Sequence, residues 1–225
     1  MKIGILLAGH TPGPLRETHG NFDQMFARLL NGRDFEFSSF DLLDGASPSV
    51  DQADGWLIPG SLHGVYEDHA WLPTLEQLIR DINYAKKPLI GVCFGHQIIA
   101  KALGGQVEKF QGGWAVGYTE YELDGKTVAL NAWHQDQVIA APSNARALAS
   151  NAHCEHAVLA YDDHIWTVQA HPEFDGPFID GLLQDYGPGV VPDDLLHAAA
   201  NQTQAPTDAA WLATQMADFF QKARA

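Results

Sequence analysis

The segment Pro88 to Gly104, PLIGVCFGHQIIAKALG, limits most strongly how this 225-residue chain can fold. An apolar stretch of strand length runs into Cys93 and is followed by a stretch with helical spacing. Gly91 and Gly95 lie two residues before and after the cysteine. This spacing is typical of a tight strand-to-helix turn that holds a nucleophile in a strained backbone conformation, where flanking side chains would collide with the backbone. The helix N-terminus there also favours a thiolate over a thiol.

Strand-like and helix-like stretches alternate through the first two-thirds of the chain. Apolar runs of strand length occupy residues 2–8, 55–59 and 88–92, and residues 35–41 alternate between apolar and polar, as a strand does. Stretches with helical spacing occupy residues 21–30, 71–82 and 95–103. This order predicts an α/β fold with three layers, a mostly parallel open sheet with helices on both faces. We expect a Gly- and Pro-rich loop at 9–20 and an antiparallel excursion at the sheet edge within 106–130.

The length is compatible with one domain spanning residues 1–225. Within it, residues 175–225 are expected to form a helical C-terminal extension. Its last helix carries an apolar stripe of Trp211, Leu212, Met216, Phe219 and Phe220. We expect this stripe to dock on the sheet, the alternative being a dimer interface.

Charge and cysteine content exclude several classes of function. The chain has 28 acidic and 13 basic residues, a net charge of −15. Such a chain repels nucleic-acid phosphates and anionic lipid headgroups, so we expect neither partner. No apolar run approaches the ~20 residues of a membrane span. The two cysteines, Cys93 and Cys154, form no disulfide framework, which favours a reducing cytoplasmic location.

The second chemical feature is the segment 168–174, VQAHPEF. Pro172 holds its neighbour in an extended conformation, so His171 and Glu173 point to the same side of the chain. A carboxylate can then orient one imidazole nitrogen while the other faces a nucleophile. The pair follows a predicted strand, and strand ends carry the active sites of parallel α/β sheets. Together with Cys93 it predicts a nucleophile, base and orienter.

Three signatures carry a resemblance to a known family: Pro59-Gly60-Ser61 after the third strand, GVCFGHQ at 91–97 and AHPEF at 170–174. The chain resembles class I glutamine amidotransferases of the Cys-His-Glu type, which implies a flavodoxin-like fold. It is most similar to stand-alone proteins related to the amidotransferase domain of GMP synthase. The stretches NFDQMFARLL, GGWAVG and WHQDQV, at 21–30, 112–117 and 133–138, carry that closer likeness.

The resemblance implies a role for each matching position. Cys93 would attack the γ-carboxamide of glutamine, His171 would accept the thiol proton and pass it to the leaving ammonia, and Glu173 would orient His171. The oxyanion would be bound by backbone amides of Ser61 and Phe94, although Gly60 is an alternative because Ser61 stands where glycine is common. The implied substrate-binding residues are Gln97 and a loop of Trp133, His134, Gln135 and Asp136.

The implied reaction is hydrolysis of glutamine through a γ-glutamyl thioester, which yields glutamate and ammonia. No G-x-x-x-x-G-K-[ST] phosphate loop occurs, so the ammonia would need an acceptor, such as a separate synthase subunit. The main alternative is a γ-glutamyl peptidase or hydrolase that cuts γ-glutamyl conjugates with the same triad. A third alternative is a binding module with a vestigial site, against which the intact triad argues.

No cofactor and no metal are expected. The stretch NAHCEHA at 151–157 offers His153, Cys154 and His156 as metal ligands. In a strand, however, His153 would point away from the other two residues.

Overall fold

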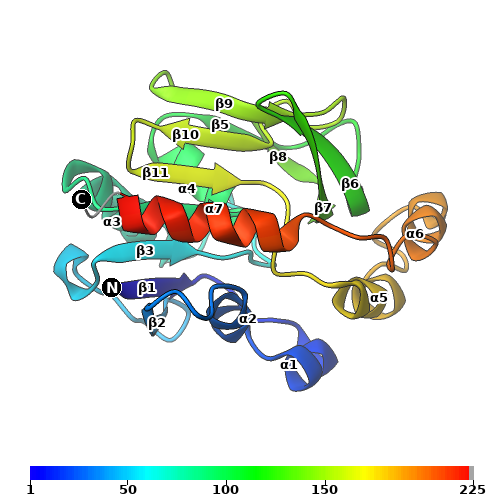
Figure 1. Ribbon diagram of the computed structural model, residues 1–225, viewed down its shortest axis with the longest axis horizontal. Helices are drawn as coiled ribbons and strands as arrows, with labels where there is room; N and C mark the ends of the chain where they lie inside the picture. The colour runs from blue at the N-terminus through cyan, green and yellow to red at the C-terminus, as the bar shows by residue number, and fades with distance from the viewer. Residues whose placement is uncertain (223–225) are drawn as a thin grey trace.

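A nine-stranded sheet forms the centre of the protein, in the computed structural model that describes residues 1–222 (Figure 1). Its first five strands, in the order β2-β1-β3-β4-β11, are parallel. They are β1 (Lys2–Leu7), β2 (Glu36–Asp41), β3 (Gly55–Ile58), β4 (Leu89–Val92) and β11 (Ile165–Val168). β3 and β4 are buried along their whole length, because helices cover both faces of the sheet there.

The sheet continues as four antiparallel strands in the order β10-β9-β6-β7. They are β10 (Val158–Tyr161), β9 (Ala145–Ser150), β6 (Ala115–Leu123) and β7 (Lys126–His134). A separate two-stranded sheet pairs β5 (Gln106–Lys109) with β8 (Asp136–Ala140). The expected excursion is therefore larger than 106–130, and β8 and β9 are additional strands.

Seven α-helices among residues 1–222 flank this sheet. They are α1 (Gly13–His19), α2 (Phe22–Leu29), α3 (Leu72–Tyr84), α4 (Phe94–Ala102), α5 (Gly176–Asp185), α6 (Asp193–Ala200) and α7 (Ala209–Lys222). In Figure 1, α7 crosses in front of the sheet while α3 and α4 lie behind it. Two apolar cores follow: one joins the sheet to α2, α5 and α7, and the other joins it to α3 and α4. The predicted three-layer α/β architecture is confirmed.

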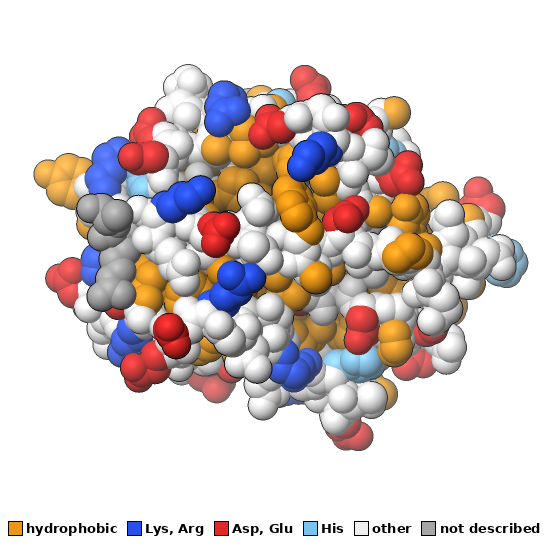
Figure 2. Space-filling model, in the orientation of Figure 1, with side chains coloured by type: hydrophobic (Ala, Val, Ile, Leu, Met, Phe, Trp, Pro, Cys, Tyr) orange, Lys and Arg blue, Asp and Glu red, His pale blue; other side chains and the backbone are white. Residues whose placement is uncertain are grey.

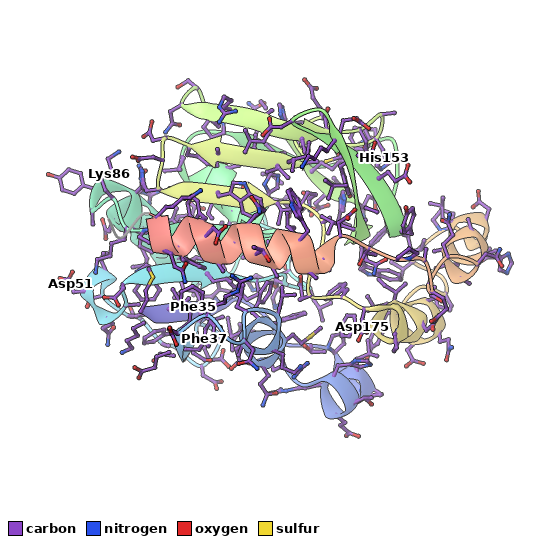
Figure 3. All side chains as sticks on the ribbon, in the orientation of Figure 1. Phe35, Phe37, Asp51, Lys86, His153 and Asp175 are labelled. Atoms are coloured by element: carbon purple, nitrogen blue, oxygen red, sulfur yellow. The ribbon has the colours of Figure 1, made fainter. Side chains whose placement is uncertain are left out.

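The stripe on α7 packs on the sheet, as expected. Leu212 and Phe220 are buried in the core that contains Ile3 and Ile5 of β1. Phe35 and Phe37, labelled in Figure 3, stand next to each other at the start of β2. The Phe35 ring meets Phe220 edge-on, with centroids 5.9 Å apart. Burial of each such side chain stabilises the fold by about 1.5–3 kcal/mol.

Asp208, directly before α7, ties this helix to the outermost strand, β7. Its amide donates a hydrogen bond to the carbonyl oxygen of Ala129 (2.7 Å), and its carboxylate accepts one from the Ala129 amide (2.8 Å). On the same strand, the carbonyl oxygen of Asn131 accepts a hydrogen bond from the His171 amide at 2.8 Å. These contacts attach the C-terminal segment to the strand that leads into residues 131–134.

Two local predictions need correction. The expected loop at 9–20 contains helix α1, since Pro14 in the first turn is compatible with a helix N-terminus. Helix α6 was not predicted, because its short sequence DDLLHAAA has little apolar periodicity.

Acidic and basic side chains intermix on the face shown in Figure 2, with apolar patches between them. Among residues 1–222, no helix combines the length and hydropathy that crossing a bilayer requires.

The turn between β4 and α4 brings two elements unusually close. Cys93 has φ 51° and ψ −103°, a conformation that L residues rarely adopt and that costs about 1–3 kcal/mol. A Cβ at Gly91 would lie 2.5 Å from the carbonyl oxygen of Gly95. A Cβ at Gly95 would overlap the carbonyl oxygen of Ile58 at the end of β3. The two glycines allow this turn to form.

Replacing Gly95 by Ala is therefore expected to destabilise the protein by roughly 1–3 kcal/mol or more, since backbone atoms of β3 must move. Urea unfolding measures the change. Gly13→Ala is the matched control, because the new methyl group meets only the Tyr186 hydroxyl, at 3.3 Å. Equal stability of Gly95→Ala and the parent protein would contradict the argument.

Candidate active site

His171 and Glu173 form a buried hydrogen-bonded pair just after β11. Nδ1 of His171 lies 2.7 Å from Oε1 of Glu173, and both side chains are almost inaccessible to solvent. With a carboxylate as its partner, Nδ1 is the protonated nitrogen. Nε2 is then the nitrogen that is free to exchange a proton with another group.

Two neighbours fix the plane and position of the His171 ring. Phe174 stacks on it, with ring centroids 3.9 Å apart and an interplanar angle of 3°. Asn131 of β7 accepts the His171 amide and also donates its side-chain amide to the carbonyl oxygen of Phe174, at 2.9 Å. The end of β7 therefore holds the segment 171–174 at both ends. Sequence analysis missed Asn131, because its contacts join segments about 40 residues apart.

The structure brings Cys93 and His171 together. The Cys93 side chain is close enough to contribute a hydrogen bond and a charge interaction to the imidazole. Burial disfavours the charged ring and is the largest influence on its pKa. The carboxylate of Glu173, and then Cys93, together outweigh burial, so the pKa of His171 is raised. The arrangement stabilises an imidazolium and can move a proton between sulfur and nitrogen.

Gly60 and Ser61 follow β3, and Gly60 lies beside both His171 and Cys93. A Cβ at Gly60 would lie 2.9 Å from Cε1 of His171 and 3.8 Å from Cβ of Cys93, so only glycine fits there. Ser61 donates its hydroxyl to the carbonyl oxygen of Ala8 at 2.7 Å. Within residues 1–222, the amides of Ser61 and Phe94 are not paired with a backbone carbonyl. These two amides are therefore the candidates for binding an oxyanion beside the thiol.

A cleft of about 240 Å³ opens beside Cys93. Its wall contains the thiol, the oxyanion candidates Ser61 and Phe94, and a set of aromatic and charged side chains. All five residues that the resemblance implies for substrate binding line it: Gln97, Trp133, His134, Gln135 and Asp136.

Gln97 lies one helical turn after Cys93, and its amide donates to the Cys93 carbonyl oxygen at 3.0 Å. Its side-chain nitrogen donates to the carbonyl oxygen of Asp136 (2.9 Å) and to Oε1 of Gln169 (3.1 Å). The nitrogen is thus used within the protein, and the side-chain carbonyl oxygen is the group left for a ligand.

Residues 133–136 are not a loop, contrary to expectation. Trp133 and His134 end β7, Asp136 begins β8, and a single residue joins them. Burial, and then the charge of His171, lower the pKa of His134 to about 3, so its ring is neutral. Oδ1 of Asp136 accepts the hydroxyl of Tyr66 at 3.0 Å. Both strands hold these side chains on one wall of the cleft.

Several residues of the cleft were missed by sequence analysis. Tyr66, Lys109 and Trp114 come from three separate segments, and Tyr66 and Lys109 belong to no motif. Trp114 meets Trp133 edge-on at 6.1 Å between centroids, and the pair forms an aromatic wall. The only available signal was that Trp114 stands inside the stretch GGWAVG.

His153, Cys154 and His156 do not lie in a strand, contrary to expectation. They lie in the turn between β9 and β10, where the Asn151 side chain accepts the amides of His153 and Cys154. In the part of the chain that the structure describes, they do not converge as metal ligands.

Comparison with known proteins agrees with this geometry. The family model for glutamine amidotransferase class-I matches residues 19–178. Gamma-glutamyl peptidase 4 of Arabidopsis thaliana is 30% identical over 176 residues, which cover 71% of this chain and 70% of that protein. A glutamine-hydrolyzing GMP synthase subunit of Halobacterium salinarum is 32% identical over 170 residues, which cover 70% of this chain and 86% of that protein.

Among solved structures, a glutamine amidotransferase from Methylobacillus flagellatus superposes with a TM-score of 0.77 at 21% identity. The match covers 99% of this chain and 94% of that chain. This likeness concerns the fold. The family match, which spans more than half of the chain, shows that the chain belongs to the class I glutamine amidotransferase family.

Proposed function

We propose that this enzyme hydrolyses γ-glutamyl amide bonds through a Cys93 thioester, and that its preferred substrates are γ-glutamyl conjugates with a bulky amine. The observation that carries the proposal is the cleft of about 240 Å³ beside Cys93, with its aromatic wall. Ammonia, the leaving group from glutamine, needs no such wall, whereas an apolar or aromatic amine gains contact area from it.

Before the first half of the proposed reaction, the proton of the Cys93 thiol has passed to Nε2 of His171, in line with the raised pKa of that ring. The Cys93 sulfur then bonds to the γ-carbonyl carbon. The amides of Ser61 and Phe94 donate hydrogen bonds to the resulting oxyanion, and each such donor contributes about 3 kcal/mol to transition-state stabilisation. Glu173 keeps the protonated ring oriented. When the carbon–nitrogen bond breaks, His171 donates the proton to the leaving amine, and a γ-glutamyl thioester remains.

In the second half, water attacks the thioester and His171 accepts the water proton. The carbon–sulfur bond then breaks, which releases glutamate and returns the proton to sulfur. Gln97, His134, Gln135 and Asp136 are the residues we assign to holding the glutamyl part, as the family resemblance implies. Trp133, which the resemblance also assigns to the substrate, meets Trp114, and we place it between the glutamyl part and the amine. The reaction requires a reduced thiol; both cysteines are free, and we place the enzyme in a reducing cytoplasm.

A second candidate is glutamine hydrolysis coupled to a separate synthase subunit that accepts ammonia. Its support is the 32% identity to a glutamine-hydrolyzing GMP synthase subunit over 86% of that protein's length. The two candidates differ in what they require. A partner-dependent enzyme is expected to hydrolyse glutamine only weakly when the partner subunit is absent. A peptidase is expected to be fully active alone.

The first prediction from this proposed reaction concerns the nucleophile. Cys93→Ser is expected to lower kcat/KM for any γ-glutamyl substrate by at least about 10³-fold, because the weaker nucleophile cannot form the thioester. Cys154→Ala is the matched control; this thiol is buried in the core and should be dispensable for turnover. Mass spectrometry should detect a γ-glutamyl adduct on Cys93 of the parent only. Full activity of Cys93→Ser would refute the mechanism.

The second prediction concerns the leaving group. Trp114→Ala should lower kcat/KM for a γ-glutamyl conjugate of an aromatic amine by roughly 2- to 10-fold, the range expected for one aromatic contact. Glutamine hydrolysis should stay unchanged. Tyr84→Ala removes an aromatic ring that is 90% exposed and does not line the cleft, so it serves as the control. A parent enzyme that prefers free glutamine over all conjugates would favour the coupled reaction instead.

The third prediction concerns pH. Since the pKa of His171 is raised in the folded protein, its charged ring stabilises the fold fully below the unfolded value, about 6.5. That stabilisation is lost as the pH rises through the folded value. Between about pH 6 and about pH 9, the unfolding free energy of the parent should therefore fall further than that of Glu173→Gln, by on the order of 1 kcal/mol or more. Urea titrations at both pH values test this, and parallel pH profiles would disprove it.

A further inference from the structure

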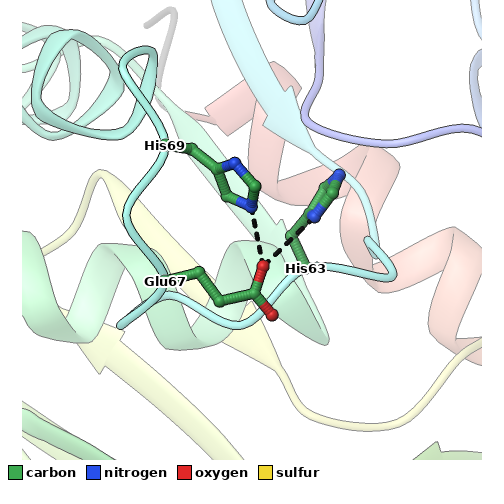
Figure 4. A group of neighbouring side chains, drawn as sticks. All are labelled: His63, Glu67 and His69. Atoms are coloured by element: carbon green, nitrogen blue, oxygen red, sulfur yellow. Dashed lines mark hydrogen bonds and ion pairs between the residues drawn. The ribbon is translucent and has the colours of Figure 1, made fainter.

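The segment between β3 and α3 carries a cluster of two imidazoles and one carboxylate, shown in Figure 4. Oε2 of Glu67 lies 2.7 Å from Nε2 of His69 and 3.2 Å from Nδ1 of His63. The ligand atoms of these residues all lie within 4.8 Å of one another. In Figure 4 both rings turn a nitrogen toward the same carboxylate oxygen.

Neighbouring groups hold these three side chains in place. The other carboxylate oxygen of Glu67 accepts the amide of Gly64 at 2.8 Å, which fixes the carboxylate. The His69 ring stacks on Trp71, with centroids 5.4 Å apart and an interplanar angle of 9°. In metal sites, contacts of this kind orient the side chains that bind the ion. The cluster is thus ordered before any ion binds.

We propose that His63, Glu67 and His69 form a binding site for a transition-metal ion of the zinc(II) type. Two imidazole nitrogens and one carboxylate oxygen suit zinc and its neighbours, whereas magnesium and calcium prefer oxygen ligands only. The three side chains are 31–42% exposed, so an ion can reach them and water can complete its coordination. The net charge of −15 attracts cations to the protein.

The position of the proposed site predicts that a bound ion would restrain one wall of the cleft. His63 and His69 lie near the two ends of the loop that follows Ser61, and an ion bound to both would restrain that loop. The backbone amide of His63 also donates to the Ser61 hydroxyl at 3.0 Å. His63 and Glu67 line the same cleft as Cys93. Metal binding is therefore expected to order the wall of the cleft, whatever reaction the cleft performs.

The test uses Cys93→Ser protein throughout, because the thiol and His171 would otherwise offer zinc a competing site. Isothermal calorimetry with zinc chloride should give one ion per chain with a Kd in the micromolar range or tighter. The added variants His63→Ala/His69→Ala and Glu67→Gln should weaken binding by at least about 100-fold and about 10-fold, respectively. His197→Ala removes an exposed imidazole on α6 and should leave the Kd unchanged.

A second readout identifies the ligands. Cobalt(II) chloride, used in place of zinc, should produce visible absorption bands that disappear in His63→Ala/His69→Ala and persist in His197→Ala. Hydrogen exchange at the amides of residues 62–69 should slow when zinc is added. If the double variant fails to fold, Glu67→Gln decides the outcome, since it keeps the shape of the side chain. Absence of stoichiometric binding, or equal binding by Glu67→Gln and its parent, would overturn the proposal.

Discussion

The close approach of α4 to the end of β3 is the constraint on which the candidate site depends. The amide of Gly95 donates to the carbonyl oxygen of Pro59 at 3.1 Å, and no side chain fits between these backbones. The contact sets the strained conformation of Cys93 and places Gly60 against His171. A substitution that separated the two elements would therefore disturb the thiol, the imidazole and the amides together.

The junction between the parallel and antiparallel halves of the sheet supplies the remaining site residues. β11 leads into His171 and Glu173, while β7 ends in Trp133 and His134. The backbone bridge between Asn131 and His171 joins these two elements. The antiparallel strands thus do more than extend the sheet at its edge. They hold the base and one wall of the cleft in fixed positions relative to the nucleophile, which lies directly before α4.

Sequence alone predicted the parts of the site that depend on local chemistry. The elbow around Cys93 and the pairing of His171 with Glu173 arise from spacings of two residues, and the structure has both. Parallel strands and their helices were also predicted, because apolar periodicity is strong there. β8, β9 and α6 were missed, since short, weakly apolar segments are defined by tertiary pairing.

Sequence periodicity and short motifs did not predict the contacts between segments that are far apart in the chain. Tyr66 reaches Asp136 across 70 positions of the sequence, and Trp114 reaches Trp133 through the pairing of β6 with β7. The cluster of His63, Glu67 and His69 lies within one short segment, yet its spacing in a loop gave no periodic signal. The hydrogen bond from the Gly64 amide to Glu67 and the stacking of His69 on Trp71 hold its members in place.

The backbone contacts along β7 have one more consequence. A strand at the margin of a sheet offers free amides and carbonyls to strands of other molecules, which promotes aggregation. Here Asp208 occupies both backbone groups of Ala129, and His171 occupies the carbonyl oxygen of Asn131. These three backbone groups next to the candidate site are therefore not available to a strand of another molecule, and the bond from His171 also fixes the segment that carries the base.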